Sequence, residues 1–210
     1  MAKIENGAII YPGVVVGEGS IVRADAVVDK SIPPHCEVSG NPAQIVRHLN
    51  PGIDLERAEQ HLLRASSAVG ETKLAFGCSL HTLGYFEDIR GELIYGCSTE
   101  NLPFTPVRVF ITNVASAQTI RGEHAHRTLC EFLLPISGSL RVALTDGAES
   151  FALELDSPNI GLFIPTGVWS CQYSFSENTS LLVLASEPYK QDSYIRSFDQ
   201  FLEFRRSTSA

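Results

Sequence analysis

The sequence predicts an all-β fold, in which a double-sheet jelly roll follows a short parallel β-helix segment and a connecting helix. Short apolar stretches separated by turn residues fill the chain from residue 71 onward, which is typical of antiparallel sheets. A hexad repeat occupies the start of the chain, and a helical pattern separates it from the strands. We therefore expect a β-helix remnant at 1–50, a helical connector at 51–70, and a jelly-roll domain with a C-terminal helix at 71–210.

In the first part, an apolar residue recurs every six positions, at Ile4, Ile10, Val16, Val22 and Val28. Glycine, Asp and Asn residues fill the intervening turns, so each hexad is interpreted as one flat side of a parallel β-helix. Because so short a solenoid cannot bury its own faces, its sides are expected to associate with other chains.

The end of this part, with the turn Gly40-Asn41-Pro42-Ala43, resembles the closing segment of hexapeptide-repeat acyltransferases. In that family the turn lies near the acyl-CoA site, three hexads complete one left-handed coil, and the assembly is a trimer. The family's catalytic histidine lies on upstream coils that are not among these hexads, and His35 falls in the exit loop. We therefore expect a remnant that self-associates, and we regard acetyltransferase activity as the weaker hypothesis.

The connector begins after Pro51-Gly52, which breaks the preceding element. Asp54 is a suitable N-cap, and apolar residues from Leu55 onward fall on one helical face.

The composition excludes several functional classes. The net charge is −8 with no basic cluster beyond Arg205-Arg206, so we expect no nucleic-acid binding. No apolar run approaches the ~20 residues that cross a bilayer, and the N-terminal residues lack the apolar core of a signal peptide, so we expect no membrane partner. The five cysteines are scattered without a Cys-x-x-Cys pair, which favours reduced thiols and a cytoplasmic location.

The jelly-roll domain is expected to contain about ten short strands, the number that a double sheet of this kind requires. They are predicted at Lys73–Phe76, Gly91–Tyr95, Pro106–Asn113, Arg121–His126, Leu129–Ser137, Ser139–Thr145, Glu149–Leu155, Gly161–Ile164, Trp169–Ser174 and Ser180–Ser186. A helix is expected over Asp192–Phe204, with Tyr194, Phe198 and Phe201 packed against the barrel.

A candidate site lies in the predicted strand Arg121–His126. His124 and His126 are one residue apart, so in a strand they point to the same side. Four residues then lead to Glu131, and six more lead to Gly138. This spacing matches the first motif of the cupins, a large class of jelly-roll proteins.

The second cupin motif, Pro-x-Gly-x-x-His, begins here at Pro165 but has Ser170 after Trp169 and no histidine. Many metal cupins use that histidine together with the His, His and Glu of the first motif. Three ligands and a water would still suit zinc or iron, but the missing ligand leads us to expect no metal and no other cofactor. Without a metal, the two imidazoles are candidates for general acid–base catalysis, and the alternative is a pair of hydrogen-bonded core histidines.

Several stretches carry a closer resemblance, in this order along the chain: Phe86–Leu93, Leu102–Phe110, Arg121–His126, Gly161–Pro165, Leu182–Ser186 and Tyr194–Arg196. Residues 74–206, which contain them, resemble the sugar 3,4-ketoisomerases that act on dTDP-4-keto-6-deoxyglucose, a cupin family also called WxcM-like. The motif Arg-Gly-x-His-Ala-His is specific to that family. Members fused to a hexapeptide acetyltransferase are known, which fits the first part of this chain.

The resemblance implies a metal-free isomerisation of a dTDP-linked keto-deoxy sugar. A base removes the proton at C3, an enediol forms, and a proton returns at C4, so that the ketone moves from C4 to C3. The implied roles are His126 as the main acid–base residue, His124 as a shuttle or orienting group, and Arg121 as a stabiliser of the enediolate or a phosphate ligand.

The resemblance also suggests substrate-binding residues. Arg90 and Arg108 are candidates for the nucleotide diphosphate, with an ordinary ion pair as the alternative for each. Trp169 either stacks on the sugar or thymine or belongs to the core. Glu131 and Phe110 are assigned to the same substrate site.

Three departures from the family leave open an altered substrate or a second hypothesis, a non-catalytic nucleotide-sugar-binding cupin associated with an acyltransferase. The family commonly carries Tyr where this chain has Phe110 and often Lys where it has Val107, and some relatives have His where it has Ser170. The family also implies a cupin dimer with exchanged strands. Combined with trimerising hexads, this predicts a homo-oligomer larger than a dimer.

Overall fold

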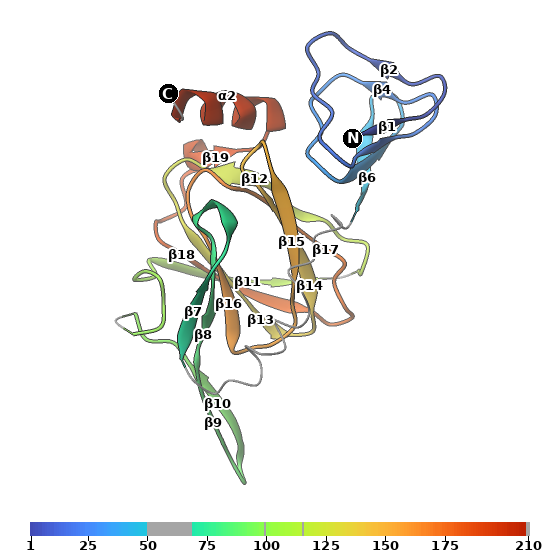
Figure 1. Cartoon of the computed structure of the whole chain (residues 1–210). Helices are drawn as coiled ribbons and strands as arrows, with labels where there is room; N and C mark the ends of the chain where they lie inside the picture. The colour runs from blue at the N-terminus through green and yellow to red at the C-terminus, as the bar shows by residue number, and fades with distance from the viewer. Residues whose placement is uncertain (50–68, 99, 115, 209–210) are drawn as a thin grey trace.

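Two antiparallel sheets face each other in the computed structural model, which describes residues 1–49, 69–98, 100–114 and 116–208 (Figure 1). The six-stranded sheet has the order β11-β18-β13-β16-β8-β7, and its members are β7 (Gly70–Lys73), β8 (Ser79–Thr82), β11 (Arg108–Asn113), β13 (Glu131–Ser137), β16 (Ile160–Ile164) and β18 (Ser180–Ala185). The five-stranded sheet has the order β15-β14-β17-β12-β19, and its members are β12 (Arg121–His126), β14 (Leu140–Thr145), β15 (Ser150–Leu155), β17 (Trp169–Tyr173) and β19 (Tyr194–Ile195). The predicted all-β jelly roll is therefore confirmed.

The main core lies between these sheets, because alternate residues of each strand point inward. Leu133 and Leu162 of one sheet and Leu140, Val142 and Leu153 of the other are at most 1% exposed and belong to one cluster. Three residues of this core, Leu133, Leu181 and Val183, also line the cavity that the polar residues of β12 face.

Besides β8 and β19, which were not predicted, two further strands of the domain were missed or misplaced. The strand expected at Lys73–Phe76 is wrong, since β7 ends at Lys73 and a short 3-10 turn, η1 (Ala75–Gly77), follows. The hairpin of β9 (Gly84–Asp88) and β10 (Gly91–Tyr95) projects from the barrel (Figure 1). Apolar side chains remain exposed on this hairpin, among them Phe86, Ile89 and Leu93.

The C-terminal helix begins later than its helical spacing predicts. A 3-10 turn, η2 (Gln191–Ser193), and β19 replace the first residues of the predicted helix, because Ile195 pairs with Ala125 in the sheet. Helix α2 (Phe198–Thr208) then packs Phe198 and Phe201 against the outer face of the five-stranded sheet. Within the described ranges, the structure has no helix long and apolar enough to cross a membrane.

The N-terminal segment, residues 1–49, forms stacked short strands beside α2 (Figure 1). These are β1 (Lys3–Ile4), β2 (Ile9–Ile10), β3 (Ile21–Val22), β4 (Val27–Val28), β5 (Cys36–Ser39) and β6 (Gln44–His48). Parallel pairs join Ile4 to Val22 and Ile10 to Val28, which are three hexads apart. The left-handed sense and the link to acyltransferases stay predictions. The predicted connector helix lies outside the described residues, except for Val69 and Gly70.

Candidate active site

A β-bulge in β12 arranges the candidate site. Gly122 lies opposite Cys171 of β17 and His124 lies opposite Ser170, so Glu123 is an extra residue in its strand. Strict alternation would set Arg121 and His124 on opposite faces, but the extra residue brings both to the face that Ser170 and Gln172 share. The bulge therefore turns Arg121 and His124 towards the same cavity.

The bulge requires glycine at position 122. Gly122 has φ +79°, and a Cβ there would lie 2.9 Å from the Gln172 side-chain oxygen. Glu123 also has a left-handed backbone, with φ +53°, which is uncommon for a residue with a side chain. The surrounding contacts must hold this conformation, since the residue itself disfavours it.

The His124 ring has a defined tautomer. Its Nδ1 lies 2.8 Å from the Gly122 carbonyl oxygen, which accepts hydrogen bonds only, so Nδ1 carries the proton. Nε2 therefore keeps its lone pair, and it is buried with no hydrogen-bond partner in the part of the chain that the structure describes. Burial lowers the pKa of His124 below its ordinary value, against the opposing effect of the Gly122 carbonyl. The ring is thus a neutral base with a free Nε2.

His126 lies deeper and faces a carboxylate. Its Nε2 is 3.4 Å from Oε1 of Glu131, and both side chains are less than a tenth exposed. Burial alone would raise the pKa of Glu131, but its hydrogen bond and electrostatic interaction with His126, together with the nearby Arg108, outweigh this and hold the pKa below its ordinary value. Glu131 is therefore a buried carboxylate anion behind the two imidazoles.

Tyr194, which was not predicted for the site, packs its ring against both histidines. Its ring centroid lies 4.3 Å from that of His126 and 5.1 Å from that of His124. Arg108 donates a hydrogen bond to the Tyr194 hydroxyl at 3.4 Å and stacks over Phe110. The signal that could have located Tyr194 was its place in Tyr194–Arg196, one of the stretches that resemble the family, but its helical spacing with Phe198 obscured this.

These residues surround a cavity of about 360 Å³, within the size range of small-molecule sites. His124, Arg121, Glu131 and Phe110, all predicted for the site, are joined in its wall by unpredicted residues: Gln172, Tyr194 and Arg196. His126 is not part of the wall, so of the two histidines it is His124 that faces the cavity directly. The predicted rank of His126 as the main acid–base residue accordingly needs revision.

Two of the predicted substrate-binding residues lie elsewhere. Trp169 is 4% exposed on the outer face of β17, where it packs against Phe198 and Phe201. The expectation that it stacks on the substrate is therefore wrong, because its side chain points away from the cavity. Arg90 lies in the turn of the β9–β10 hairpin and pairs with Asp88, away from the cavity of its own chain.

The histidines and Glu131 also form a set of donors that a divalent cation would accept. One ligand atom of each lies within 4.8 Å of the others. At the position of the fourth ligand, the Ser170 hydroxyl accepts a hydrogen bond from the Gln172 amide at 3.4 Å. The expected absence of a metal stays a prediction that metal analysis must test.

Two kinds of known proteins resemble different parts of this chain. The family model described as WxcM-like, C-terminal (FdtA) matches residues 76–206. A TDP-4-oxo-6-deoxy-α-D-glucose-3,4-oxoisomerase of Aneurinibacillus thermoaerophilus is 37% identical over 117 residues, which cover 56% of this chain and 84% of the relative. A second kind of relative, a provisionally named acetyltransferase of Staphylococcus aureus, is 38% identical over 55 residues, or 26% of this chain and only 28% of the relative.

Solved structures agree with the first relative. The sugar 3,4-ketoisomerase QdtA of Thermoanaerobacterium thermosaccharolyticum, solved with TDP, superposes with a TM-score of 0.62 at 30% identity, covering 64% of this chain and 98% of that one. The TDP-quinovose 3,4-ketoisomerase WlaRB of Campylobacter jejuni superposes with a TM-score of 0.58 at 36% identity, covering 61% of this chain and 98% of that one. The chain belongs to the WxcM-like family of cupin sugar 3,4-ketoisomerases.

Proposed function

We propose that this chain converts a TDP-linked 4-keto-6-deoxyhexose into its 3-keto isomer. The support for the substrate class comes from the relatives whose names state it, an isomerase acting on TDP-4-oxo-6-deoxyglucose and a ketoisomerase solved with TDP. The observation that carries the proposal is the neutral His124, whose ring lines the cavity and whose unprotonated Nε2 has no hydrogen-bond partner among the described residues.

The reaction needs one base and no external oxidant. His124 Nε2 takes the proton from C3, which is acidic because it is next to the C4 ketone, and the electron pair of the C3–H bond forms the enediolate. The proton of the C3 hydroxyl moves to the oxygen on C4. Reprotonation at C4 then completes the sequence, leaving a ketone at C3 and a hydroxyl at C4.

His126 and Glu131 would support His124 during these transfers. The two imidazole centroids are 4.8 Å apart, and the Glu131 anion lies beyond them. A negative charge near the pair stabilises the imidazolium that forms once the proton has left the sugar. We therefore exchange the predicted roles, so that His124 contacts the substrate carbon while His126 relays or shares the proton.

The cationic and phenolic side chains have separate tasks in this proposal. Arg121, in the cavity wall, would stabilise the enediolate or hold a phosphate oxygen. Arg108 would fix the Tyr194 hydroxyl, and Tyr194 would supply a hydroxyl near the histidines where Phe110 has none.

Proton exchange with solvent tests the proposed activity. We expect incubation with TDP-4-keto-6-deoxyglucose in deuterated water to place deuterium at C3 of the remaining substrate and at C4 of the 3-keto product. Binding without exchange would instead favour a non-catalytic nucleotide-sugar-binding cupin. Activity that disappears on chelation and returns with zinc or iron would overturn the metal-free mechanism.

We also infer that the working form is a homo-oligomer. The β9–β10 hairpin exposes Phe86, Ile89 and Leu93, and the edge strand β11 exposes Val109 and Ile111. Exposed apolar edges of this kind are usually covered by another chain. Exchange of the hairpin between two copies would cover both surfaces, and it would give Arg90 its route to a substrate in the other copy.

The exposed side of the N-terminal segment supports a second contact. Ile4, Ile9 and Tyr11 are 45%, 55% and 51% exposed, which suits the predicted association through the hexads. We expect light scattering to give a mass above that of a dimer, and Ile89→Asp together with Leu93→Asp to lower it. A monomeric wild-type protein would contradict both contacts. The predicted cytoplasmic location is untested by these measurements.

A further inference from the structure

The N-terminal segment contacts the jelly roll at the strand that carries the histidines. His48, at the end of β6, is 7% exposed, although the strand to which it belongs is otherwise largely at the surface. Its Nε2 lies 3.1 Å from the Cys171 sulfur and 3.7 Å from Oε1 of Glu123, and its ring packs against Tyr173. His48 thus reaches both strands that flank the bulge.

The two nitrogens of the His48 ring face separate partners, Nδ1 towards Cys36 and Nε2 towards Cys171 and Glu123. Burial raises the pKa of both the Cys36 and Cys171 thiols, so both remain protonated. The Cys36 sulfur lies 3.5 Å from Nδ1, where its S–H can donate, and Nε2–H is then directed to Glu123 and Cys171. The ring is fixed from the N-terminal side and presents its donor to the bulge.

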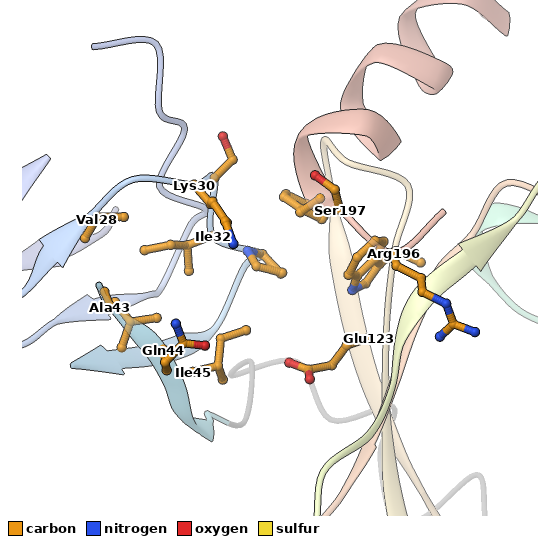
Figure 2. A pocket seen from close by; sticks show the side chains of 14 residues that line it. Val28, Lys30, Ile32, Ala43, Gln44, Ile45, Glu123, Arg196 and Ser197 are labelled. Carbon is orange, nitrogen blue, oxygen red and sulfur yellow. The ribbon is translucent and has the colours of Figure 1, made fainter. Parts of the chain in front are cut away.

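Glu123 is the residue that makes the bulge, and its side chain leaves the barrel. Figure 2 shows its carboxylate directed towards Ile45 of the N-terminal segment, whereas Arg196 extends the other way, towards the barrel. A left-handed backbone at a residue with a Cβ persists when neighbouring contacts fix it. His48 contacts Glu123 on the face opposite His124.

We propose that His48 is a positioning residue, which holds Glu123 and so keeps Arg121 and His124 on the same face of β12. The inference rests on the proposed roles of His124 and Arg121. A second attachment keeps His48 in place, because the Ser31 amide donates a hydrogen bond to Asp199 of α2 at 3.1 Å. The N-terminal segment is in this way part of the active-site scaffold of the isomerase.

Two amide variants separate the contacts of the ring. In His48→Gln the side-chain nitrogen occupies the place of Nε2 and still reaches Glu123, whereas in His48→Asn it occupies the place of Nδ1 and does not. We expect His48→Asn to lower kcat about 10- to 100-fold, the effect of misplacing catalytic groups by a fraction of an ångström to about one ångström. KM should change less than about threefold, and His48→Gln should keep kcat within about threefold of the wild type.

A glycine at position 123 provides the decisive background. Glycine adopts positive φ without cost, so in Glu123→Gly the bulge no longer needs the contact with His48, which we call the anchor. In Glu123→Gly we expect His48→Asn to change kcat less than about twofold. The same loss in both backgrounds, or equal kcat per folded site for the Gln and Asn variants, would overturn the proposal. Arg47→Ala is the matched control, because Arg47 is next to His48 but has an exposed side chain that pairs with Glu37.

Hydrogen exchange of the amides of residues 122–126 makes the test independent of turnover. We expect faster exchange in His48→Asn than in His48→Gln or Arg47→Ala, and unchanged exchange would count against the anchor. If the wild-type protein shows no isomerisation, the proposed function fails, while the exchange measurement still decides whether His48 holds the bulge.

Discussion

Replacing His124 by Asn isolates the base from the fold. The Asn amide nitrogen occupies the place of Nδ1, so the 2.8 Å hydrogen bond to the Gly122 carbonyl can persist, but the base at Nε2 is lost. A positioned general base contributes about 10²- to 10⁴-fold to the rate, which corresponds to about 2.7–5.4 kcal/mol in the activation barrier. We expect kcat to fall within that range, with KM changed less than about threefold because the other cavity residues remain.

The assay follows the conversion of TDP-4-keto-6-deoxyglucose and the uptake of deuterium at C3 by nuclear magnetic resonance. His126→Asn, measured in parallel, tests the exchange of roles and should retain more C3 exchange than His124→Asn. Thermal unfolding of both variants checks that the fold survives. The reasoning is refuted if His124→Asn exchanges at more than a tenth of the wild-type rate while His126→Asn is inactive.

Three further outcomes follow from the geometry. Burial holds the pKa of His124 below its ordinary value of 6.5, so most His124 rings are unprotonated in the folded protein at pH 6.5. We therefore expect kcat/KM to decline only below that pH. A pH profile whose acidic limb lies at or above 6.5 would contradict this. Glu131→Gln removes the charge behind the imidazoles and should lower kcat about 100-fold at an unchanged nucleotide affinity, measured by TDP titration; a wild-type rate would exclude the carboxylate from proton transfer. Phe201→Ala empties a fully buried site under α2 and should reduce the free energy of unfolding by about 3–5 kcal/mol in urea titrations, without raising KM; a raised KM would show that the outer face of the sheet reaches the substrate.

Most strands of the jelly-roll domain were predicted from period-two alternation and turn residues. β10 and β12 have the predicted bounds, and most other strands differ by one or two residues. The prediction failed where local and tertiary effects compete. Phe76 has a left-handed backbone, with φ +60°, and ends the strand expected there. Tyr194 has helical spacing with Phe198, yet pairing with His126 places it in β19.

The site residues were predicted unevenly for a physical reason. His124, Glu131 and Phe110 lie on strands whose inward face a spacing argument can identify. Trp169 lies on the opposite face of its strand from Ser170, and the motif that contains both does not say which of the two faces the cavity. Arg90 lies in a turn away from the cavity of its own chain, so it can bind a substrate only in the cavity of another copy.

The bulge explains why an alternation rule alone cannot assemble this site. Arg121 and His124 are three positions apart, a spacing that sends them to opposite faces of a regular strand. Gly122 has φ +79° and Glu123 has φ +53°, and these left-handed residues form the bulge. The extra residue brings the side chains of Arg121 and His124 to the same face of β12. Gly122 is visible in the sequence, but Glu123 gives no local sign of a left-handed backbone. Its stabilising partner, His48, is 75 positions earlier in the chain, so the geometry of the histidine pair depends on a contact that no reading of the motif by itself can contain.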